Sequence, residues 1–369
     1  MRQIETKMPS FLSNKKIKAF GLDISDNSIK IMQLDQTKNG FKPSVFANSA
    51  LSDKVISNHM IINEKRLADN ISDALLRAVG LTTKFVVCSV PEAKSFVRTL
   101  TIQKMSDSEI DSSVPFEIEQ EIPIPVDQVY LDWQINREVG GKLELLVMAT
   151  PKDYMDSLVK CLRLAKLVPV AMELESQATA RAVIGAADLK NNVLIIDVAT
   201  NQTSFIIADS GVIEYTSSIP IAGNALTASI ARELNVALSA AEDLKRASGL
   251  VIDTKQGNIR KVLLPVVDNI VDEAKNVMRF FEEHDPAHKS IQTVLLCGGS
   301  ARLLGLVDYF STRINLGSSR PPIRVVLGDP WVNVFSHTAE GAVPLTPFDA
   351  LGYTTVIGLA LRGANLTDY

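Results

Sequence analysis

The sequence predicts a duplicated α/β fold with two lobes and a small α+β subdomain inserted into the first lobe. The first observation is a hairpin near the start of the chain, in which an apolar strand ends on Asp23 and a second strand follows a short polar turn. The second is the return of this arrangement at Asp197, in "VLIIDVATNQTSFIIAD". The third is a block of strands and helices at 91–170 that interrupts the repeat. Two halves that each begin with the same hairpin and continue into helices indicate an internal duplication.

Composition limits the classes of protein that this chain can represent. The 369 residues allow two or three domains at about 100–200 residues each, and an apolar fraction of 46% is ample for a core. The net charge of −4 makes a broad basic surface, and therefore a nucleic-acid partner, unexpected. Cys88, Cys161 and Cys297 lie far apart in apolar contexts and are interpreted as reduced packing residues. No apolar run reaches the ~18–20 residues that a membrane span needs, so contact with a membrane is expected only through a partner.

Strands separated by turn residues open the first lobe. Lys18–Ile24, Ser28–Gln33 and Phe41–Ser49 are predicted strands, and Asn39-Gly40 is typical of a hairpin turn. In Glu64–Val79 the apolar side chains recur at the spacing of one helix face. Those expected on that face are Leu67, Ile71, Leu75, Leu76 and Val79.

The inserted block reads as strand, helix, strand, strand, helix. "SFVRTLTI" is a predicted strand, and "SDSE", Ser106 to Glu109, is a capping box that begins a helix. That helix is expected to end or kink near Pro115 or Ile122. "IPIPVDQVYLDWQINRE" is expected to be extended and "LELLVMAT" to be a strand, and Lys152–Leu167 is a predicted helix.

The second half begins after a predicted helix at Glu173–Ile184. Strands are expected at Val193–Val198, Thr203–Ala208, Val212–Ser218, in "TVLLC" and in "IRVVLGDP". Helices are expected at Asn224–Leu234, at Ser239–Ala247 with the capping box "SAAE", at Ile259–Glu283 with a break or adjustment at Pro265, and at Phe348–Arg362.

These elements define the predicted domains. Residues 1–16 have no continuous apolar stretch and are expected to be a flexible leader. The other ranges are a first lobe at 17–90 and 171–190 with 345–369 packing back on it, an insert at 91–170, and a second lobe at 191–344 with a helical subdomain at about 224–290.

The two acids at strand ends form the main candidate site. Ligands of α/β sheets usually bind outside the carboxyl ends of strands, so Asp23 and Asp197 are expected to meet one ligand in a cleft between the halves. Turns after such strands can direct backbone N–H groups at an anion. Carboxylates can hold Mg²⁺ through its coordinated water, because Mg²⁺ sheds water reluctantly.

Five segments, in this order along the chain, resemble motifs of the actin-like ATPase superfamily, whose fold is ribonuclease H-like and which includes actin, Hsp70 and sugar kinases. They are "DISDNSIK" (Asp23–Lys30), "ELESQATAR" (Glu173–Arg181), "DVATNQTS" (Asp197–Ser204), "LCGGSARLLGL" (Leu296–Leu306) and "IGLALRG" (Ile357–Gly363). The inserted region, with "FVRTL" and "IPIPVDQVYLDWQ", resembles the type IV pilus assembly protein PilM family, relatives of FtsA.

This resemblance implies a site for ATP or ADP with Mg²⁺. Asp23 and Asp197 would hold the ion through water, with Asp197 near the attacking water as the candidate catalytic residue. The implied nucleotide-binding residues are Asp23, Ser25, Asn27, Ser28 and Lys30 in the first hairpin, Ala199, Thr200, Asn201, Gln202 and Thr203 in the second, and Gly298, Gly299, Ser300 and Arg302 in the glycine turn.

Hydrolysis is expected to be slow or absent, because the phosphate-loop glycines of the family are replaced by Ser25 and Ala199. Their side chains narrow the approach of an anion, and Asp26 adds a negative charge there.

The resemblance also implies the partners. The expected function is a cytoplasmic scaffold of the type IV pilus machine, peripheral to the inner membrane through the N-terminal peptide of the membrane protein PilN. An extended peptide can add to a strand edge, and the edge candidates are Val90, Phe96, Arg98 and Leu100. Pilus motor ATPases and other copies of the chain are further expected partners.

Two alternative functions stay open. An FtsA-like division or cytoskeletal filament protein is expected to end in a basic amphipathic helix, whereas "LRGANLTDY" is short and slightly acidic. A small-molecule kinase needs a base over a substrate pocket, and the sequence offers no convincing one. His284 and His288, at metal-like spacing, and the carboxylates Glu117, Glu119 and Glu121 are interpreted as solvated side chains.

Overall fold

The computed structural model describes residues 17–38, 40–51, 55–251, 259–284, 289–317, 321–335 and 345–366. The predicted leader at 1–16 lies outside the described residues. The chain divides into two compact units, the first within Met1–Ala182, Trp331–Pro344 and Thr355–Tyr369, the second within Val183–Pro330 and Leu345–Thr354. Residues 345–354, expected with the first lobe, therefore group with the second unit.

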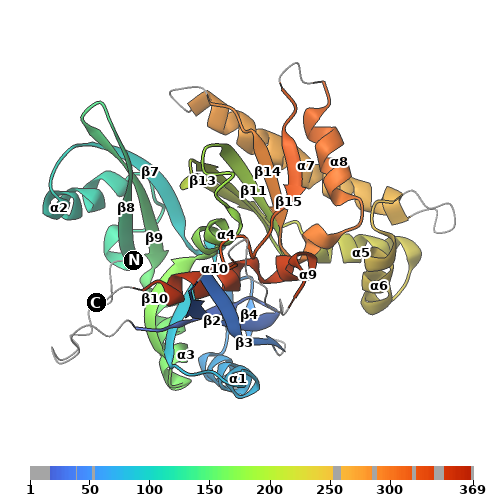
Figure 1. Ribbon diagram of the computed structural model, residues 1–369, viewed down its shortest axis with the longest axis horizontal. Coiled ribbons are helices and arrows are strands. Elements are labelled where there is room, and N and C mark those ends of the chain that lie inside the picture. Colours follow the sequence, from blue (N-terminus) through green and yellow to red (C-terminus); the bar gives the residue numbers. More distant parts are fainter. Residues whose placement is uncertain are drawn as a thin grey trace. The chain divides into compact units, whose positions relative to one another are not determined.

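A five-stranded sheet of order β10-β6-β1-β2-β3 forms the centre of the first unit (Figure 1). Strands β1 and β2 are antiparallel, as are β2 and β3, whereas β6 and β10 run parallel to β1. The bounds are β1 Phe20–Ile24, β2 Ser28–Thr37, β3 Gly40–Ala50, β6 Phe85–Val90 and β10 Val168–Leu174. Strand β10 was not predicted, and its helix α4 (Glu175–Val183) begins at Glu175 rather than at Glu173. The chain stays extended as far as Leu174, the last residue of β10 that pairs with β6, and α4 therefore begins after it.

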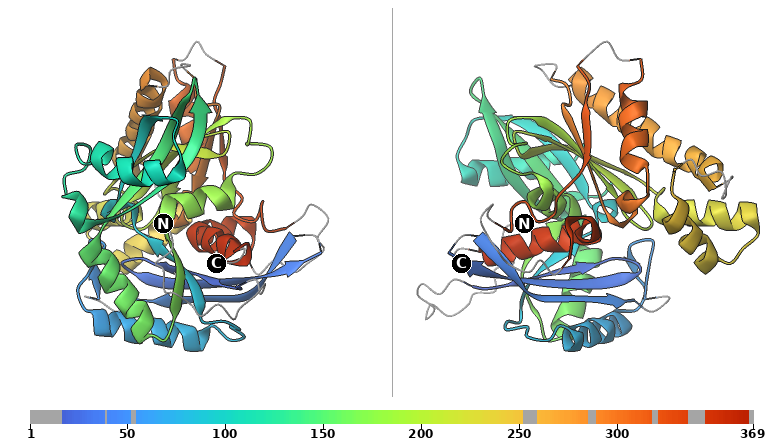
Figure 2. Two further views of the ribbon diagram at one scale, coloured as in Figure 1. Left: turned by 90° about the vertical axis from the view of Figure 1, so that its left-hand side faces the viewer. Right: turned by 45° about the vertical axis from the view of Figure 1, so that its right-hand side comes forward.

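Helices cover both faces of this sheet. Figure 2 shows α10 (Thr354–Ala364, red) on one face and α1 (Glu64–Arg77, blue) with α3 (Lys152–Leu164, green) on the other. The small hairpin of β4 (Ile56–Ser57) and β5 (Met60–Ile61) precedes α1. Closely packed backbones hold α10 in place, because a Cβ at Gly358 would collide with the carbonyl of Ala178.

The predicted buried face of α1 is correct in part. Leu67 and Ile71 are fully buried, but Leu76 is 80% exposed and Val79 84% exposed. At about 100° per residue, Leu76 lies half a turn away from Leu67, and Val79 lies beyond the end of the helix.

The inserted block forms its own three-stranded antiparallel sheet of order β7-β9-β8. Its elements are β7 Phe96–Gln103, α2 Asp107–Ile118, β8 Val129–Val139 and β9 Lys142–Pro151, with 3-10 turns at Glu92–Lys94 and Val126–Gln128. The predicted capping box of Ser106 and Glu109 is present, and α2 continues past Pro115. A separate core, which includes Ile110, Val114 and Leu145, holds this sheet against α2.

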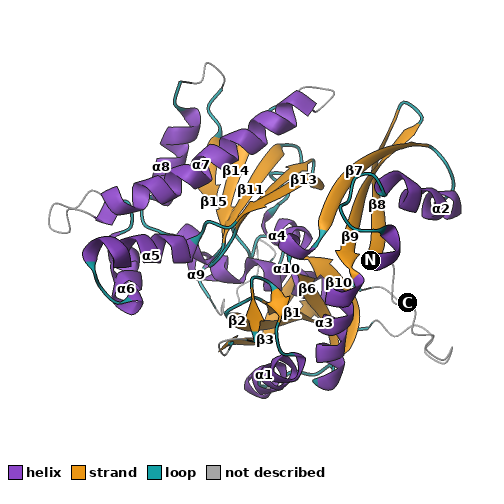
Figure 3. Ribbon diagram, turned by 180° about the vertical axis from the view of Figure 1, so that it is seen from behind, coloured by secondary structure: helices purple, strands orange, loops and turns teal. Residues whose placement is uncertain are grey.

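The second unit repeats the strand order of the first. Its sheet runs β13-β12-β11-β14-β15, with two antiparallel pairs followed by two parallel ones, as in β3-β2-β1-β6-β10 (Figure 3). The strands are β11 Asn192–Val198, β12 Thr203–Asp209, β13 Val212–Ile219, β14 Thr293–Cys297 and β15 Arg324–Leu327. The predicted duplicated α/β fold is therefore confirmed.

The helices of the second unit are α5 Gly223–Leu234, α6 Leu238–Ser248, α7 Ile259–His284, α8 Leu306–Asn315 and α9 Pro347–Ala350, with 3-10 turns at Gly299–Arg302 and Leu351–Tyr353. The predicted break at Pro265 is wrong, because α7 is continuous and Pro265 lies on its exposed side. The predicted single helix at Phe348–Arg362 is α9, a 3-10 turn and α10.

The predicted capping box of α6 is also wrong. The helix begins after Ala237, which makes no side-chain capping hydrogen bond. Glu242, the expected capping partner of Ser239, bonds to other side chains instead.

Candidate functional site

Asp23 is the penultimate residue of strand β1, and its carboxylate is buried in the first unit. The residue is 5% exposed, and Oδ1 accepts a hydrogen bond of 3.1 Å from the hydroxyl of Ser89 on β6. Its Oδ2 lies 3.5 Å from Nζ of Lys30, the residue opposite Asp23 in the β1–β2 ladder. Mg²⁺ prefers oxygen ligands such as carboxylates. It usually keeps several of its water molecules, so one carboxylate can hold it through water without other side chains around the ion. The chemistry of Asp23 therefore fits the implied ion.

Two serines close the turn after Asp23. The Ser25 N–H donates to Ser28 O at 2.9 Å, and the Ser28 N–H donates to Ser25 Oγ at 3.2 Å. Asn27 lies exposed at the tip, and its carbonyl accepts the Leu51 N–H at 2.9 Å. Ser25 thus stands where the motif of the resembled family has glycine, and its hydroxyl forms hydrogen bonds with Ser28 inside the turn.

Asp26 is engaged by the small β4–β5 hairpin. Its Oδ1 accepts the backbone N–H of His59 at 3.1 Å and lies 3.8 Å from His59 Nδ1. Asn58 and His59 both have positive φ, a backbone conformation that needs such support in residues other than glycine. The negative charge of Asp26 therefore has a structural partner in the turn that it stabilises.

In the second unit, Asp197 on β11 lies opposite Ser204 of β12 and Cys297 of β14. The backbone of Gly298 packs directly against it, because a Cβ at Gly298 would collide with Asp197 Oδ1. Gly298 has φ +86°, which also favours glycine. At Gly299, by contrast, a Cβ would find no described atom within 4 Å. The glycine turn is therefore closed on the side of Asp197 and open at Gly299.

The β11–β12 turn anchors the start of helix α5. The carbonyl of Ala199 accepts the Gly223 N–H at 3.2 Å and the Ser300 hydroxyl at 2.9 Å. The carbonyl of Thr200 accepts the Asn224 N–H at 2.8 Å, and further bonds tie Asn224 Nδ2 to Asn201 and the Thr203 hydroxyl to Ile221 O. The predicted residues Ala199, Thr200 and Ser300 thus lie together, with Ala199 also bonded to Gln202 O.

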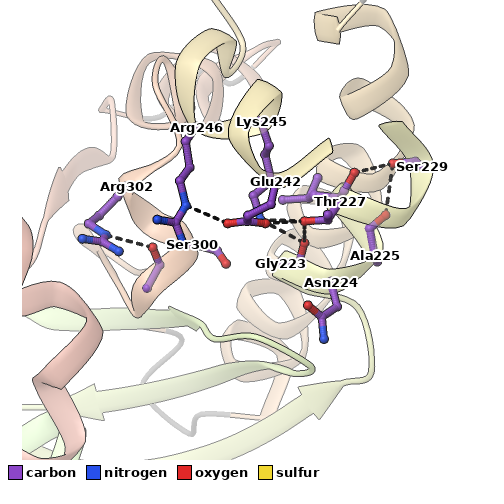
Figure 4. Close-up of polar contacts among 12 residues, drawn as sticks. Gly223, Asn224, Ala225, Thr227, Ser229, Glu242, Lys245, Arg246, Ser300 and Arg302 are labelled. Carbon is purple, nitrogen blue, oxygen red and sulfur yellow. Dashed lines mark hydrogen bonds and ion pairs between the residues drawn. The ribbon is translucent and has the colours of Figure 1, made fainter. Parts of the chain in front are cut away.

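Helix α6 contributes three charged side chains that the sequence analysis did not select (Figure 4). Lys245 Nζ lies 2.6 Å from Glu242 Oε2, and it donates to Thr227 Oγ1 at 2.9 Å and to Gly223 O at 3.2 Å. Arg246 Nε donates to Glu242 Oε1 at 2.8 Å. The Glu-x-x-Lys-Arg spacing puts all three on one helix face, and this was the signal available in the sequence.

The pKa of Glu242 reflects this cluster. Burial opposes ionisation and raises the pKa, but hydrogen bonds from Lys245, Thr227 and Arg246 more than offset it and lower the pKa to about 2. Glu242 is therefore a fixed anion at neutral pH, with oxygens oriented by a lysine and an arginine.

Arg302 leaves the glycine turn close to the backbone of Gly299. Its Nε donates to Gly299 O at 3.2 Å, and its Nη1 lies 3.6 Å from Asp349 Oδ1 on α9. The side chain is 37% exposed, so its guanidinium plane is accessible to a ligand.

The first unit has a shallow pocket between the central sheet and the inserted sheet. It is lined by Val90, Tyr130, Asp132, Met148, Thr150, Met172, Leu174 and Gln177. Of the edge candidates, Val90 lines this pocket, whereas Phe96 and Leu100 pack in the core of the insert and Arg98 is exposed. The lining strands β8 and β10 are each at the edge of their sheet.

The remaining candidates show no site chemistry. Glu117, Glu119 and Glu121 are exposed, and His284 Nδ1 contacts the carbonyl of Phe280 at 2.8 Å. His288 lies outside the described residues. In the part of the chain that the structure describes, no three His, Cys, Asp or Glu side chains form a metal-binding group. None of the described helices combines the length and apolar character needed to cross a membrane.

Two α/β halves of identical strand order, each with an acid near the end of its first strand and one with an adjacent glycine turn, have the actin-like fold. The chain belongs to the family of the type IV pilus assembly protein PilM, whose model matches residues 21–364.

Solved structures share the fold, and a curated protein is similar in sequence. A structure of a PilM-PilN type IV pilus biogenesis complex matches 95% of this chain and 100% of that chain, with a TM-score of 0.80 and 22% identity. MreB5 of Spiroplasma citri bound to AMPPNP matches 87% of this chain and 94% of that chain, with a TM-score of 0.53 and 16% identity. The cell division protein FtsA of Neisseria meningitidis is 25% identical over 280 residues, 65% of this chain and 67% of that protein.

Proposed function

We propose that this protein is a nucleotide-binding scaffold of the type IV pilus assembly machine that holds the N-terminal peptide of a PilN-like membrane protein. Membership of the PilM family supports the role in pilus assembly. The observation that carries nucleotide binding is the α6 cluster of Glu242, Lys245 and Arg246 together with the open glycine at Gly299.

The second unit supplies groups for each part of a nucleotide. The carboxylate of Glu242, oriented by Lys245 and Arg246, suits the ribose hydroxyls, which are both donors and acceptors. The guanidinium planes of Arg246 and Arg302 suit a purine face, because Arg stacks on aromatic systems. The turn from Ala199 to Thr203 would receive the phosphates through backbone N–H groups. The similar MreB5 structure was solved with AMPPNP, which supports nucleotide binding by this fold.

Asp23 and Lys30 are further proposed residues for nucleotide binding. Asp23 would hold water bound to Mg²⁺, as would Asp197, and Lys30 would neutralise phosphate charge. Because Ser25 and Ala199 replace phosphate-loop glycines, we expect ATP turnover well below about 1 s⁻¹, the lower end for typical enzymes. Steady phosphate release at or above that rate would contradict this expectation.

The pocket of the first unit is the proposed peptide site. Val90, Met148, Met172 and Leu174 offer an apolar lining, and the neighbouring β8 and β10 are edge strands to which an extended peptide can pair. The related complex contains PilM and PilN, which supports this choice of partner. The protein would then act in the cytoplasm and reach the inner membrane through PilN. Contacts with motor ATPases and with further copies of the chain belong to the same proposal.

Fluorescence polarisation with a labelled PilN-like N-terminal peptide tests the partner, with and without Mg·ATP. Tyr130, 37% exposed, lines the pocket, and Phe116, 76% exposed on α2, does not. Tyr130→Ala should weaken peptide binding about tenfold or more, as for removal of an aromatic interface anchor, and Phe116→Ala should leave it unchanged. Equal affinities for wild type and both variants would contradict the pocket. A gain with nucleotide would indicate a switch, and equal binding a static scaffold.

A further inference from the structure

Ser89 lies at the end of β6, directly beside the proposed metal-water acid. The residue is 1% exposed, and its hydroxyl donates to Asp23 Oδ1 at 3.1 Å. The same Oγ accepts the backbone N–H of Ile24 at 3.1 Å. Ser89 therefore joins the backbone of β1 to its terminal carboxylate.

Strand register explains why this hydroxyl points at the acid. The last β1–β6 pair is Leu22 with Cys88, so the side chain of Ser89 replaces a backbone acceptor for the Ile24 N–H. A serine hydroxyl has one proton and two acceptor lone pairs. Since the Ile24 N–H occupies a lone pair, the proton is free to go to Asp23 Oδ1. The contact thus fixes one oxygen of the carboxylate, while Lys30 lies 3.5 Å from the other.

The second unit holds its acid differently. If the β1–β6 register is continued by one residue, Ser89 lies opposite Asp23 as Cys297 lies opposite Asp197. Burial and the charge of Asp197 raise the pKa of the Cys297 thiol, and a thiol is only a weak donor. The backbone of Gly298 also packs closely against Asp197. The residue next to the acid is therefore a serine in the first unit and a cysteine in the second.

We propose that Ser89 is a positioning residue that orients the Asp23 carboxylate towards the water shell of a nucleotide-bound divalent cation. This inference rests on the proposed nucleotide function. Without the Ser89 proton, Asp23 turns towards Lys30 or takes a different rotamer, and the water-mediated contact is lost. Contacts with the base and the ribose do not depend on Ser89.

The test is the affinity of the full chain for ADP, measured by isothermal titration in Mg²⁺ and in EDTA. Ser89→Ala should weaken binding about tenfold in Mg²⁺, the loss expected for one hydrogen bond to a charged group, and leave affinity in EDTA unchanged. The matched control is Ser49→Ala on β3 of the same sheet, where a buried hydroxyl makes no hydrogen bond among the described residues. Ser49→Ala should match wild type in both buffers.

Ser89→Cys has a side chain of nearly the same size as serine, and it is the variant to measure if Ser89→Ala does not fold. Its weak donor should give an affinity in Mg²⁺ between those of serine and alanine. A Ser89 variant that matches Ser49→Ala in both buffers, or that loses affinity equally in both, overturns the inference and leaves the proposed function in place. Wild-type protein that binds no ADP in either buffer overturns the proposed function and this inference with it.

Discussion

At the residue scale, the proposed chemistry depends on the carboxylates at the ends of two strands. Asp23 contacts a hydroxyl and a lysine, and the backbone of Gly298 packs tightly against Asp197. Asp26, expected to repel a triphosphate, instead accepts the N–H of a strained turn at His59. The β4–β5 hairpin thus orients the Asp26 carboxylate, and its negative charge remains at the first hairpin.

Glu242 should make stability depend on pH. Its pKa in the folded protein is about 2, below the ordinary value of 4.5, so its contribution is present above pH 4.5 and is lost as the pH falls towards 2. Glu242→Gln should lower the free energy of unfolding at neutral pH by about 1 kcal/mol, a value reduced for partial exposure. Urea unfolding midpoints of wild type and variant should converge as the pH falls from about 5 to about 2. A constant difference over this range would contradict the predicted linkage.

The two neighbouring glycines should respond differently to substitution. A side chain at Gly299 meets no described atom within 4 Å, so Gly299→Val should fold normally and weaken ADP binding about tenfold or more by filling the open side of the turn. Gly298→Ala should destabilise the fold itself, because its Cβ collides with Asp197 and its φ is +86°. Thermal melts separate the two effects. Normal ADP affinity in Gly299→Val would exclude this turn from the site.

The sequence was sufficient to place some of these residues. Asp23, Asp197 and Gly298 follow apolar strands, so the period of the pattern and the polar turn locate them. Glu242 was missed because "SAAE" is locally consistent with a capping box, whereas its partner Thr227 lies on another helix. Ser89 was missed because only the strand register brings it to Asp23. Contacts between distant strands leave no local pattern.

At the element scale, a buried ion network fastens helix α10 to the first sheet. Glu173 on β10 accepts from Arg181 of α4 at 2.5 and 2.7 Å and from Arg362 of α10 at 2.8 Å. Glu173 is 2% exposed. The three elements thus meet at one carboxylate, and Gly358 lets α10 approach the backbone of α4 closely.

Glu173→Ala should destabilise the protein by about 3–5 kcal/mol, because two partly buried guanidinium groups lose their counter-ion. Chemical denaturation of the variant measures this loss. Glu119→Ala, on an exposed carboxylate at the end of α2, is the control and should change stability by about 0.5 kcal/mol or less. A similar small change in Glu173→Ala would show that apolar packing alone holds α10.

Element boundaries could be predicted where the hydrophobic period was clear and the caps were local. The box of Ser106 and Glu109 is such a case. Strand β10 could not be predicted, since it is a short parallel strand that pairs with β6, more than seventy residues earlier in the chain. The continuity of α7 past Pro265 depends on burial of its sheet-facing side, which the proline alone does not reveal.

At the scale of the whole molecule, duplication accounts for the presence of two acidic strand ends. Both sheets have the same strand order, so the same hairpin is built twice from different residues. The halves have diverged at the hairpin turns, with Ser25 in one and Ala199 in the other, and at the residue behind each acid, Ser89 or Cys297. If the proposed nucleotide site is correct, this divergence should slow turnover.

The most direct measurement is titration of the full-length protein with ADP in Mg²⁺ by calorimetry, with a thermal melt of the same sample. We predict saturable binding near one nucleotide per chain and a rise in melting temperature, since a ligand that binds only the folded state stabilises it. Absence of both heat and a thermal shift at millimolar ADP would contradict the claim that this pilus-assembly scaffold binds nucleotide.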